Sequence, residues 1–280
     1  MLLAALDPTQ VAALLLAGVI AGLMGGMLGV GGGIVMIPAM LFVLGEHRFG
    51  TNSLHLYKLA AIAASLVVSL PAAARHLRAR AVVVRMVPAM LTFAAVGVIA
   101  GTLLAATFVG DLTHLLRRIF GGFLVAVVLY NVYEARRSPT SESFSNATCP
   151  MPSRFTRIGL IVGLPAGFVA GLLGIGGGVW AVPAQRYLLG TRLRNAIATS
   201  SLMIVGVAAM TALTLTISIS RMPTNGLNPL HGWLLAAVLA PGALIGGWLG
   251  ADLTHRLPLR WVRLAFQVAL GLSGLRLLLA

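Results

Sequence analysis

Two runs of three consecutive glycines have the clearest potential for chemistry in this chain: Gly31, Gly32 and Gly33, and Gly176, Gly177 and Gly178. Each glycine costs about 1 kcal/mol in a helix interior, so each run should break a helix within its long apolar stretch. A break frees backbone N–H groups at the start of the next half-helix, and these groups, with the helix dipole, can bind an anion. The alternative is a tightly packed turn without a ligand.

Two clusters of small polar side chains follow the glycine runs. They are Thr51, Asn52 and Ser53 in the first half, and Thr199, Ser200 and Ser201 in the second. We expect each cluster to lie where the next apolar helix begins. There it could cap the helix, complete the hydrogen bonds to a bound anion, or do both.

Two cationic side chains lie inside apolar stretches. Lys58 is near His55 and Tyr57, and Arg186 follows Pro183. A cation within a membrane segment is a candidate for function, although both stems could also carry their charges to the membrane surface. With the glycine runs and the two polar clusters, they complete our set of candidate substrate-binding residues.

The composition requires lipid as part of the solvent. Hydrophobic residues make up 59% of the 280 positions and charged residues 9%, against about 25% charged in soluble proteins. At roughly 20 residues per crossing, eight to ten membrane segments fit. We therefore predict an all-α integral membrane protein that spans the bilayer many times.

Ten apolar segments can be delimited. They are Thr9–Leu28, Ile34–Leu44, Leu54–Leu70, Met86–Val109, Ile119–Tyr133, Ile158–Leu173, Val179–Leu189, Ala196–Ile219, Trp233–Leu253 and Trp261–Ala280. The second and seventh are about half a membrane thick, and each follows a glycine run. The polar stretch 136–157 is predicted to be a cytoplasmic linker between a first repeat, 1–135, and a second repeat, 158–280.

The two halves resemble each other. Gly18–Pro38 aligns with Gly163–Pro183 without a gap, with 10 of 21 positions identical. Both copies follow the pattern G-x-x-x-G-x-x-G-[VI]-G-G-G-x(4)-P, and Gly97 and Gly101 align with Gly242 and Gly246. We infer an internal duplication. The G-x-x-x-G parts, which include Gly18, Gly22 and Gly26, predict close helix–helix contacts.

The arginines indicate how the halves are oriented. If each broken segment is a hairpin, each half makes an odd number of crossings, and the repeats are inverted. The loops placed inside, 71–86, 134–157, 190–195 and 254–263, then hold 13 arginines. The outside loops hold four, namely Arg48, Arg117, Arg118 and Arg221. The positive-inside rule favours this arrangement, with both termini outside.

Other kinds of function lack their usual residues. The six histidines have no metalloprotease spacing and Cys149 is alone, so we expect no enzyme, metal or cofactor. All six carboxylates fall at predicted ends or loops, which leaves no evident proton or sodium relay. The net charge of +14 is explained by the basic loops, and no aromatic-interleaved basic run indicates nucleic-acid binding.

The doubled glycine pattern, each copy followed by a Thr/Ser-Ser-Leu element, resembles the sulfite exporter TauE/SafE family of membrane permeases over nearly the whole chain. The resemblance implies transport, often export, of small sulfur oxyanions or organosulfonates across the bacterial inner membrane. Gly31–Gly33, Gly176–Gly178, Ser53 and Ser201 match the family pattern. Thr-Asn-Ser in the first half against Thr-Ser-Ser in the second departs from strict symmetry.

The main hypothesis is a secondary transporter that exports a small sulfur-containing anion by alternating access, with periplasmic termini. The inside-negative potential would be a sufficient driving force, since it supplies about 2.3 kcal/mol per charge per 100 mV. An anion channel and a carrier of an unrelated small anion are the alternatives. The predicted partners are the anion and the lipid bilayer, and the sequence leaves a homo-oligomer open.

Overall fold

The computed structural model describes residues 6–45, 48–50, 52–108, 112–137, 155–221 and 227–253, together with positions 267, 268, 271, 272, 274, 275 and 278. Within these residues the regular structure is helical, apart from one isolated bridge between Arg48 and Gly50. Seven of the described helices are long and apolar enough to cross a membrane. The prediction of an all-α, multi-pass membrane protein is therefore confirmed.

The seven candidate spans follow the apolar segments of the sequence. They are α1 (Pro8–Leu28), α3 (Ser53–Arg78), α4 (Val87–Thr107), α5 (Thr113–Arg137), the continuous run Phe155–Leu173, α9 (Leu193–Arg221) and α10 (Pro229–Leu253). The run Phe155–Leu173 joins α6 (Phe155–Ile158), a π-helical segment (Gly159–Gly163) and α7 (Leu164–Leu173). A helix such as α1, with 21 residues, is about 31 Å long and matches the hydrocarbon core of a bilayer.

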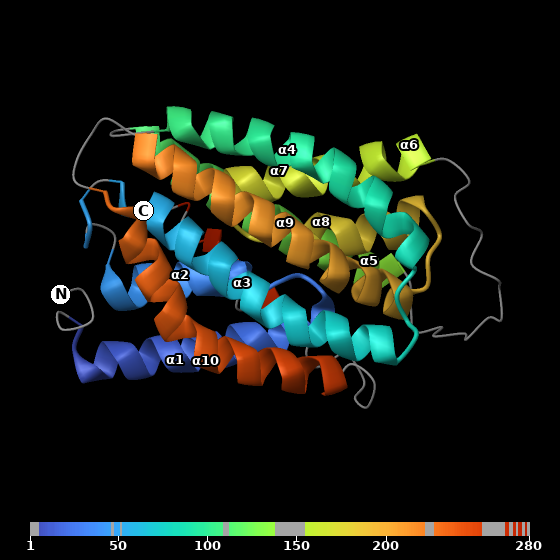
Figure 1. Cartoon of the computed structure of the whole chain (residues 1–280), viewed down its shortest axis with the longest axis horizontal. Coiled ribbons are helices and arrows are strands. Elements are labelled where there is room, and N and C mark those ends of the chain that lie inside the picture. Colours follow the sequence, from blue (N-terminus) through green and yellow to red (C-terminus); the bar gives the residue numbers. More distant parts are fainter. Residues whose placement is uncertain are drawn as a thin grey trace.

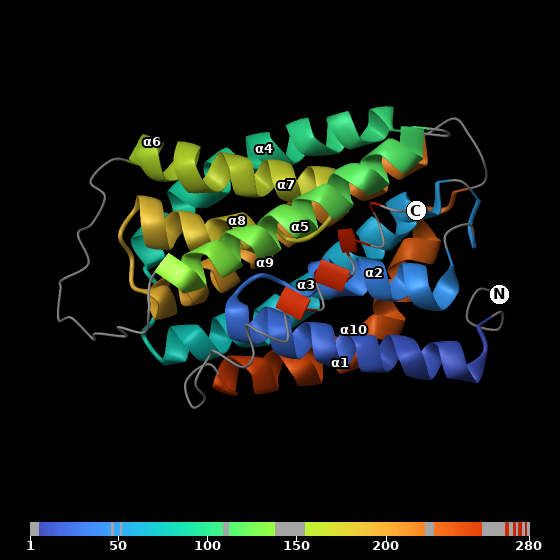
Figure 2. The ribbon, with the colours of Figure 1, turned by 180° about the vertical axis from the view of Figure 1, so that it is seen from behind.

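Both glycine runs end a helix and turn the chain into a shorter one. Gly29 and Gly174 close α1 and α7 in the left-handed conformation, with φ of 63° and 74°. The chain then enters α2 (Gly33–Leu44), or α8 (Gly178–Pro183) followed by the π-helical segment Ala184–Leu188. Figure 2 shows α2 returning beside α1, and α8 returning beside α7. Each glycine-broken segment is thus a hairpin.

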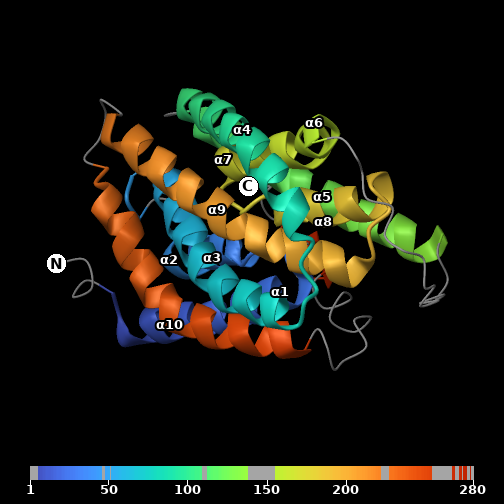
Figure 3. The ribbon, with the colours of Figure 1, turned by 45° about the vertical axis from the view of Figure 1, so that its right-hand side comes forward.

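Small residues let helices from the two halves approach closely. A Cβ on Gly18, Gly22 or Gly26 of α1 would lie 2.5 Å from a backbone oxygen of α10. On the other side, Gly97 and Gly101 of α4 are in similarly close contact with the backbone of α7. The predicted glycine-mediated helix contacts are therefore confirmed. As Figures 1 and 3 show, α3 and α9 lie between the α1–α10 pair and the α4–α7 pair.

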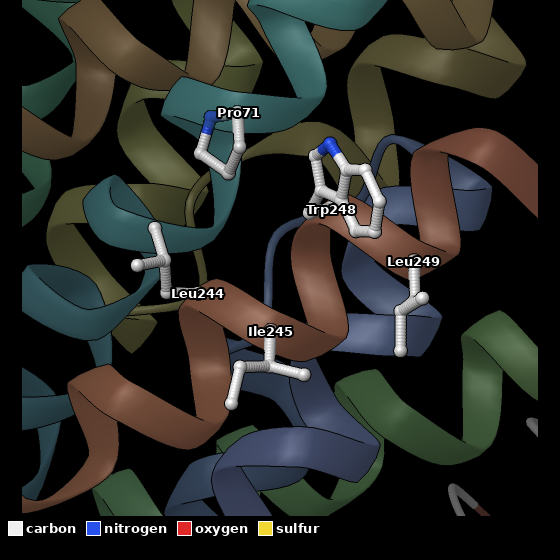
Figure 4. A pocket seen from close by; sticks show the side chains of 5 residues that line it. All are labelled: Pro71, Leu244, Ile245, Trp248 and Leu249. Carbon is white, nitrogen blue, oxygen red and sulfur yellow. The ribbon is translucent and has the colours of Figure 1, made fainter.

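Large apolar side chains cover the outer surface, as lipid contact requires. Phe42, Leu103 and Leu213 are 73%, 66% and 62% exposed. An apolar groove of about 510 Å³ also opens on this outer surface, lined by Pro71 of α3 and by Leu244, Ile245, Trp248 and Leu249 of α10 (Figure 4). None of the predicted site residues lines this groove.

The ends of some helices differ from the prediction. α5 continues to Arg137 and α6 begins at Phe155, so both ends of the predicted linker are helical, while residues 138–154 lie outside the described part. Arg117, which we expected in a loop, is buried inside α5. Most of the tenth apolar segment, Trp261–Ala280, also lies outside the described residues.

Candidate functional site

With the left-handed glycines that close α1 and α7, the two glycine runs cover residues 29–33 and 174–178, and these buried runs lie in direct contact with each other. A Cβ on Gly33 would be 2.8 Å from the carbonyl oxygen of Gly174 and 3.0 Å from the Cα of Ile175. The matching contact joins Gly178 to Gly29, whose carbonyl oxygen would be 2.4 Å from the added Cβ. Only glycine allows such close contact of two backbones. The runs therefore meet at two junctions, Gly33 with Gly174 and Gly29 with Gly178, and each junction joins one glycine of the first half to one of the second.

The backbone of the runs takes conformations suited to glycine. Gly31 and Gly176 both have φ of +80°. Among the described residues, no hydrogen bond engages the N–H groups of Gly31 and Gly32, or those of Gly176 and Gly177. Buried N–H groups without partners are rare in proteins. These N–H groups are therefore unsatisfied within the described part of the chain, and their role in binding an anion stays a prediction.

The two runs are not identical in conformation. Gly32 precedes α2 with φ of −82°, a value open to any residue, whereas the aligned Gly177 precedes α8 with φ of +71°. A Cβ on Gly32 would meet the flexible end of Met36 at 2.7 Å, but on Gly177 it would meet the backbone oxygen of Ala166 at 2.4 Å. The sequence pattern treats these positions as equivalent, and the structure distinguishes them.

Lys58 lies against the second glycine run. Its Cβ, Cα and Cγ atoms would be 2.8 to 3.0 Å from a Cβ on Gly174. The side chain is 1% exposed, and its Nζ has no hydrogen-bond partner in the described part of the chain. A buried ammonium without a counter-charge is strongly unfavourable. Lys58 thus places a buried, unpartnered amine beside the junction of the two runs, and a bound anion would stabilise its charged form.

Ser65 also lies beside the junction, and it is not among the candidate residues chosen from the sequence. Its Oγ would be 3.3 Å from a Cβ on Gly33, and its hydroxyl donates to the carbonyl oxygen of Ala61 at 2.8 Å. Ser65 follows Lys58 by seven residues, which is about two helical turns, so both side chains lie on one face of α3. That spacing is the signal that could have identified it.

The first polar cluster lies at a helix start, as predicted, but away from the glycine runs. Asn52 precedes α3, and its Oδ1 accepts a hydrogen bond from the Thr113 hydroxyl at 3.1 Å. The Ser53 hydroxyl donates to the Gly50 carbonyl at 2.7 Å and accepts from the Phe49 N–H at 2.9 Å. Both side chains thus hold the entry to α3, and Thr51 lies outside the described residues.

The second polar cluster is not at a helix start, so that expectation is wrong. Because α9 begins at Leu193, Thr199, Ser200 and Ser201 lie well inside the helix. The Ser200 hydroxyl reaches the first run and donates to the Gly29 carbonyl at 2.7 Å. Thr199 accepts from the Val83 N–H at 2.9 Å, and Ser201 donates to Ile197 within its own helix. Only Ser200 of this cluster is hydrogen-bonded to a run.

Arg186 lies in the π-helical segment after α8. Its guanidinium carbon is 5.3 Å from the centre of the Tyr187 ring, a cation–π distance. Eight residues separate it from Gly178, or about 12 Å along the helix. Arg186 therefore lies about two helical turns beyond the second glycine run. For metals, no group of three or more His, Cys, Asp or Glu side chains gathers within the described residues.

Comparison with known proteins places these features in context. A family model described as sulfite exporter TauE/SafE matches residues 14–277. The chain is 26% identical to the probable membrane transporter protein YunE of Bacillus subtilis, covering 95% of this chain and 96% of that protein. It is 26% identical to the probable membrane transporter protein MamO of Magnetospirillum gryphiswaldense, covering 92% of this chain but 43% of that longer protein. The search of solved structures found no match.

Proposed function

Since the chain belongs to the sulfite exporter TauE/SafE family of membrane transporters, we propose that it is a secondary transporter that exports a small sulfur-containing anion. The family is one of transporters and not of enzymes, in agreement with the sequence analysis. Beyond family membership, we propose which kind of anion is transported, in which direction and by which mechanism.

The observation that carries the proposal is the contact of two buried glycine runs beside an unpaired lysine. Lys58 supplies an amine that is positively charged when protonated, and Gly31 and Gly32 supply N–H groups without partners among the described residues, just before α2. Both attract negative charge, and burial strengthens that attraction because water does not screen it. A small anion would offset the cost of the buried ammonium.

We propose that the halves are inverted repeats and that transport proceeds by alternating access. In Figure 2, α1 runs from right to left and α6–α7 from left to right, and the two hairpins meet. Inverted hairpins around a central site are a recurrent design in transporters. In this mechanism the contact between the runs opens alternately toward each side of the membrane. The close backbone contact of the runs favours such a carrier over a permanently open channel.

The other predicted residues take different proposed roles. Gly176–Gly178 and Ser200 shape the opposite wall of the site, whereas Thr51, Asn52 and Ser53 stabilise the entry to α3, and Thr199 and Ser201 anchor α9. Arg186 attracts anions toward the site from a distance. We propose an inner-membrane location with both termini in the periplasm, on the basis of the 13 to 4 arginine distribution.

Flux into proteoliposomes tests the function. Purified protein is reconstituted, and uptake of radiolabelled sulfite, thiosulfate, sulfoacetate and taurine is followed against empty liposomes. We expect saturable uptake of at least one sulfur anion, with acceleration by the same anion on the opposite side. Flux of none of them, or flux of an unrelated anion alone, would refute the proposed cargo. Rapid flux that does not saturate would identify a channel.

A further inference from the structure

The helices α3 and α9 lie against the glycine runs at matching positions but with different side chains. Gly174 contacts Lys58 of α3, whereas the aligned Gly29 contacts Ile197 of α9, whose backbone oxygen would be 2.6 Å from an added Cβ. Lys58 is the sixth residue of α3 and Ile197 the fifth of α9. Lys58 and Ile197 therefore occupy matching positions against the two aligned glycines, and in this sense they are counterparts.

A second pair of counterparts lies seven residues further along each helix. Gly33 contacts Ser65 of α3, whereas the aligned Gly178 contacts Ile204 of α9, whose Cδ1 would be 2.6 Å from an added Cβ. Because seven residues make about two turns, each helix presents one face to both glycines. On this face α3 carries the Lys58 amine and the Ser65 hydroxyl. The face of α9 carries Ile197 and Ile204, with the Ser200 hydroxyl between them engaged by the Gly29 carbonyl.

The two junctions of the runs therefore differ in chemistry. The polar junction comprises Gly33, Gly174, Lys58 and Ser65, and it includes the start of α2. The apolar junction comprises Gly29, Gly178, Ile197 and Ile204, and the hydroxyl of Ser200 beside it is bonded to the Gly29 carbonyl. The half-helices themselves do not distinguish the junctions, because α2 has 12 residues, and α8 with the π-helical segment that continues it has 11.

The serine hydroxyls beside the two junctions differ in how readily they can exchange their present hydrogen bond for one to a ligand. Ser65 donates to Ala61 four residues earlier in its own helix, a bond that it can exchange for a ligand because that carbonyl also lies within the helix ladder. Ser200 donates to Gly29 at the end of α1, where helix carbonyls lack intrahelical partners. Releasing Ser200 would leave a buried carbonyl unsatisfied.

From these differences we propose that the chain binds one anion, not a symmetric pair, at the polar junction. Lys58 neutralises the anion's charge, while Ser65 and the first amides of α2 donate hydrogen bonds to its oxygens. The ligand class is a small oxyanion, which includes the sulfur oxyanions. The apolar junction binds no anion and serves as a packed contact against which the polar junction opens. This inference rests on the proposed transport function and specifies its site and stoichiometry.

Calorimetric titration of the purified full chain with sulfite tests the stoichiometry, and matched variants test the location. We expect one site per chain. Lys58→Met keeps an unbranched side chain without the charge, and it should raise Kd by about 10- to 100-fold, the range expected for lost hydrogen bonds to a charged group. The counterpart Ile197→Met should bind sulfite as the wild type does. Ser65→Ala should raise Kd by a smaller factor, about fivefold.

The outcomes separate this inference from the transport function. Two sites per chain, or a Lys58→Met protein with unchanged Kd, would overturn the inference even if the wild type transports sulfite. Absence of wild-type flux for every sulfur anion would instead overturn the proposed function. Thermal unfolding with and without sulfite shows whether each variant is folded. Because Lys58→Met removes a buried amine that has no partner, its melting temperature should be no lower than that of the wild type. If the Lys58→Met protein melts at a lower temperature, the Kd of Ser65→Ala tests the site instead. An unchanged Kd for Ser65→Ala would also count against the polar junction.

Discussion

Gly33 at the start of α2 packs against Gly174 at the end of α7, and a Cβ on Gly33 would lie 2.8 Å from the Gly174 carbonyl oxygen. Residues 141 positions apart thus form one wall of the candidate site. Because this contact joins backbone to backbone, a movement of one hairpin is transmitted to the other without a flexible side chain between them. That rigidity suits a site that must close on one side as it opens on the other.

The aligned glycines Gly32 and Gly177 should respond differently to alanine. Gly177→Ala forces a left-handed φ and a contact of 2.4 Å with a backbone oxygen, so we expect a loss of about 2–4 kcal/mol. Gly32→Ala comes within 3.0 Å only of the flexible end of Met36, with the Ala21 carbonyl oxygen at an ordinary 3.4 Å, and it should cost less than about 1 kcal/mol. Thermal unfolding in detergent measures both. Equal losses for the two variants would contradict the described turn conformations.

The contact between α4 and α7 should be sensitive to a single methyl group. A Cβ on Gly101 would lie 2.3 Å from the Phe168 carbonyl oxygen, so Gly101→Ala must separate the helices, and we expect a cost of about 1–3 kcal/mol. Gly122 of α5 is the control, because the nearest atom to its added Cβ is a side-chain carbon at 3.9 Å. Gly122→Ala should melt at or slightly above the wild-type temperature, and a similar fall for both variants would argue against close packing at Gly101.

The ion pair between Arg75 of α3 and Asp252 of α10 should contribute little to stability. Their side chains are 41% and 21% exposed, and such pairs are worth about 0–1 kcal/mol. Asp252→Asn should therefore lower the melting temperature slightly, and 1 M salt should reduce the difference from wild type. A large, salt-independent loss would show that Asp252 has a structural role beyond this pair.

Arg186 should influence the approach of the anion more than its binding. Because its guanidinium lies over the Tyr187 ring, Arg186→Gln should raise the KM for the transported anion by less than about tenfold at low salt and leave kcat unchanged. The effect should decline as salt screens long-range attraction. Flux measured over a salt series checks this, and a KM increase that persists at high salt would place Arg186 in direct contact with the anion.

Some errors in the sequence analysis share one physical cause. Polar and charged residues such as Arg192, Arg194 and Asn195 predict a loop, yet α9 begins at Leu193. Helices can extend beyond the hydrocarbon core, where water solvates charged side chains. The hydropathy pattern detects the lipid boundary and not the helix boundary. For this reason the sequence pattern places Thr199–Ser201 at a helix start, although they lie well inside α9. Arg117 is a separate case, because it is buried inside α5 and not solvated.

The sequence by itself determined that this chain lies in a membrane, that it is helical, and that glycine runs interrupt it twice. These properties follow from local rules, since lipid requires helices to satisfy their own backbone and consecutive glycines weaken them. Only the tertiary structure decided that Lys58 and Ser65 line one junction while Ile197 and Ile204 line the other. That pairing depends on how helices far apart in the sequence cross, and the spacing of residues along the chain does not specify a crossing.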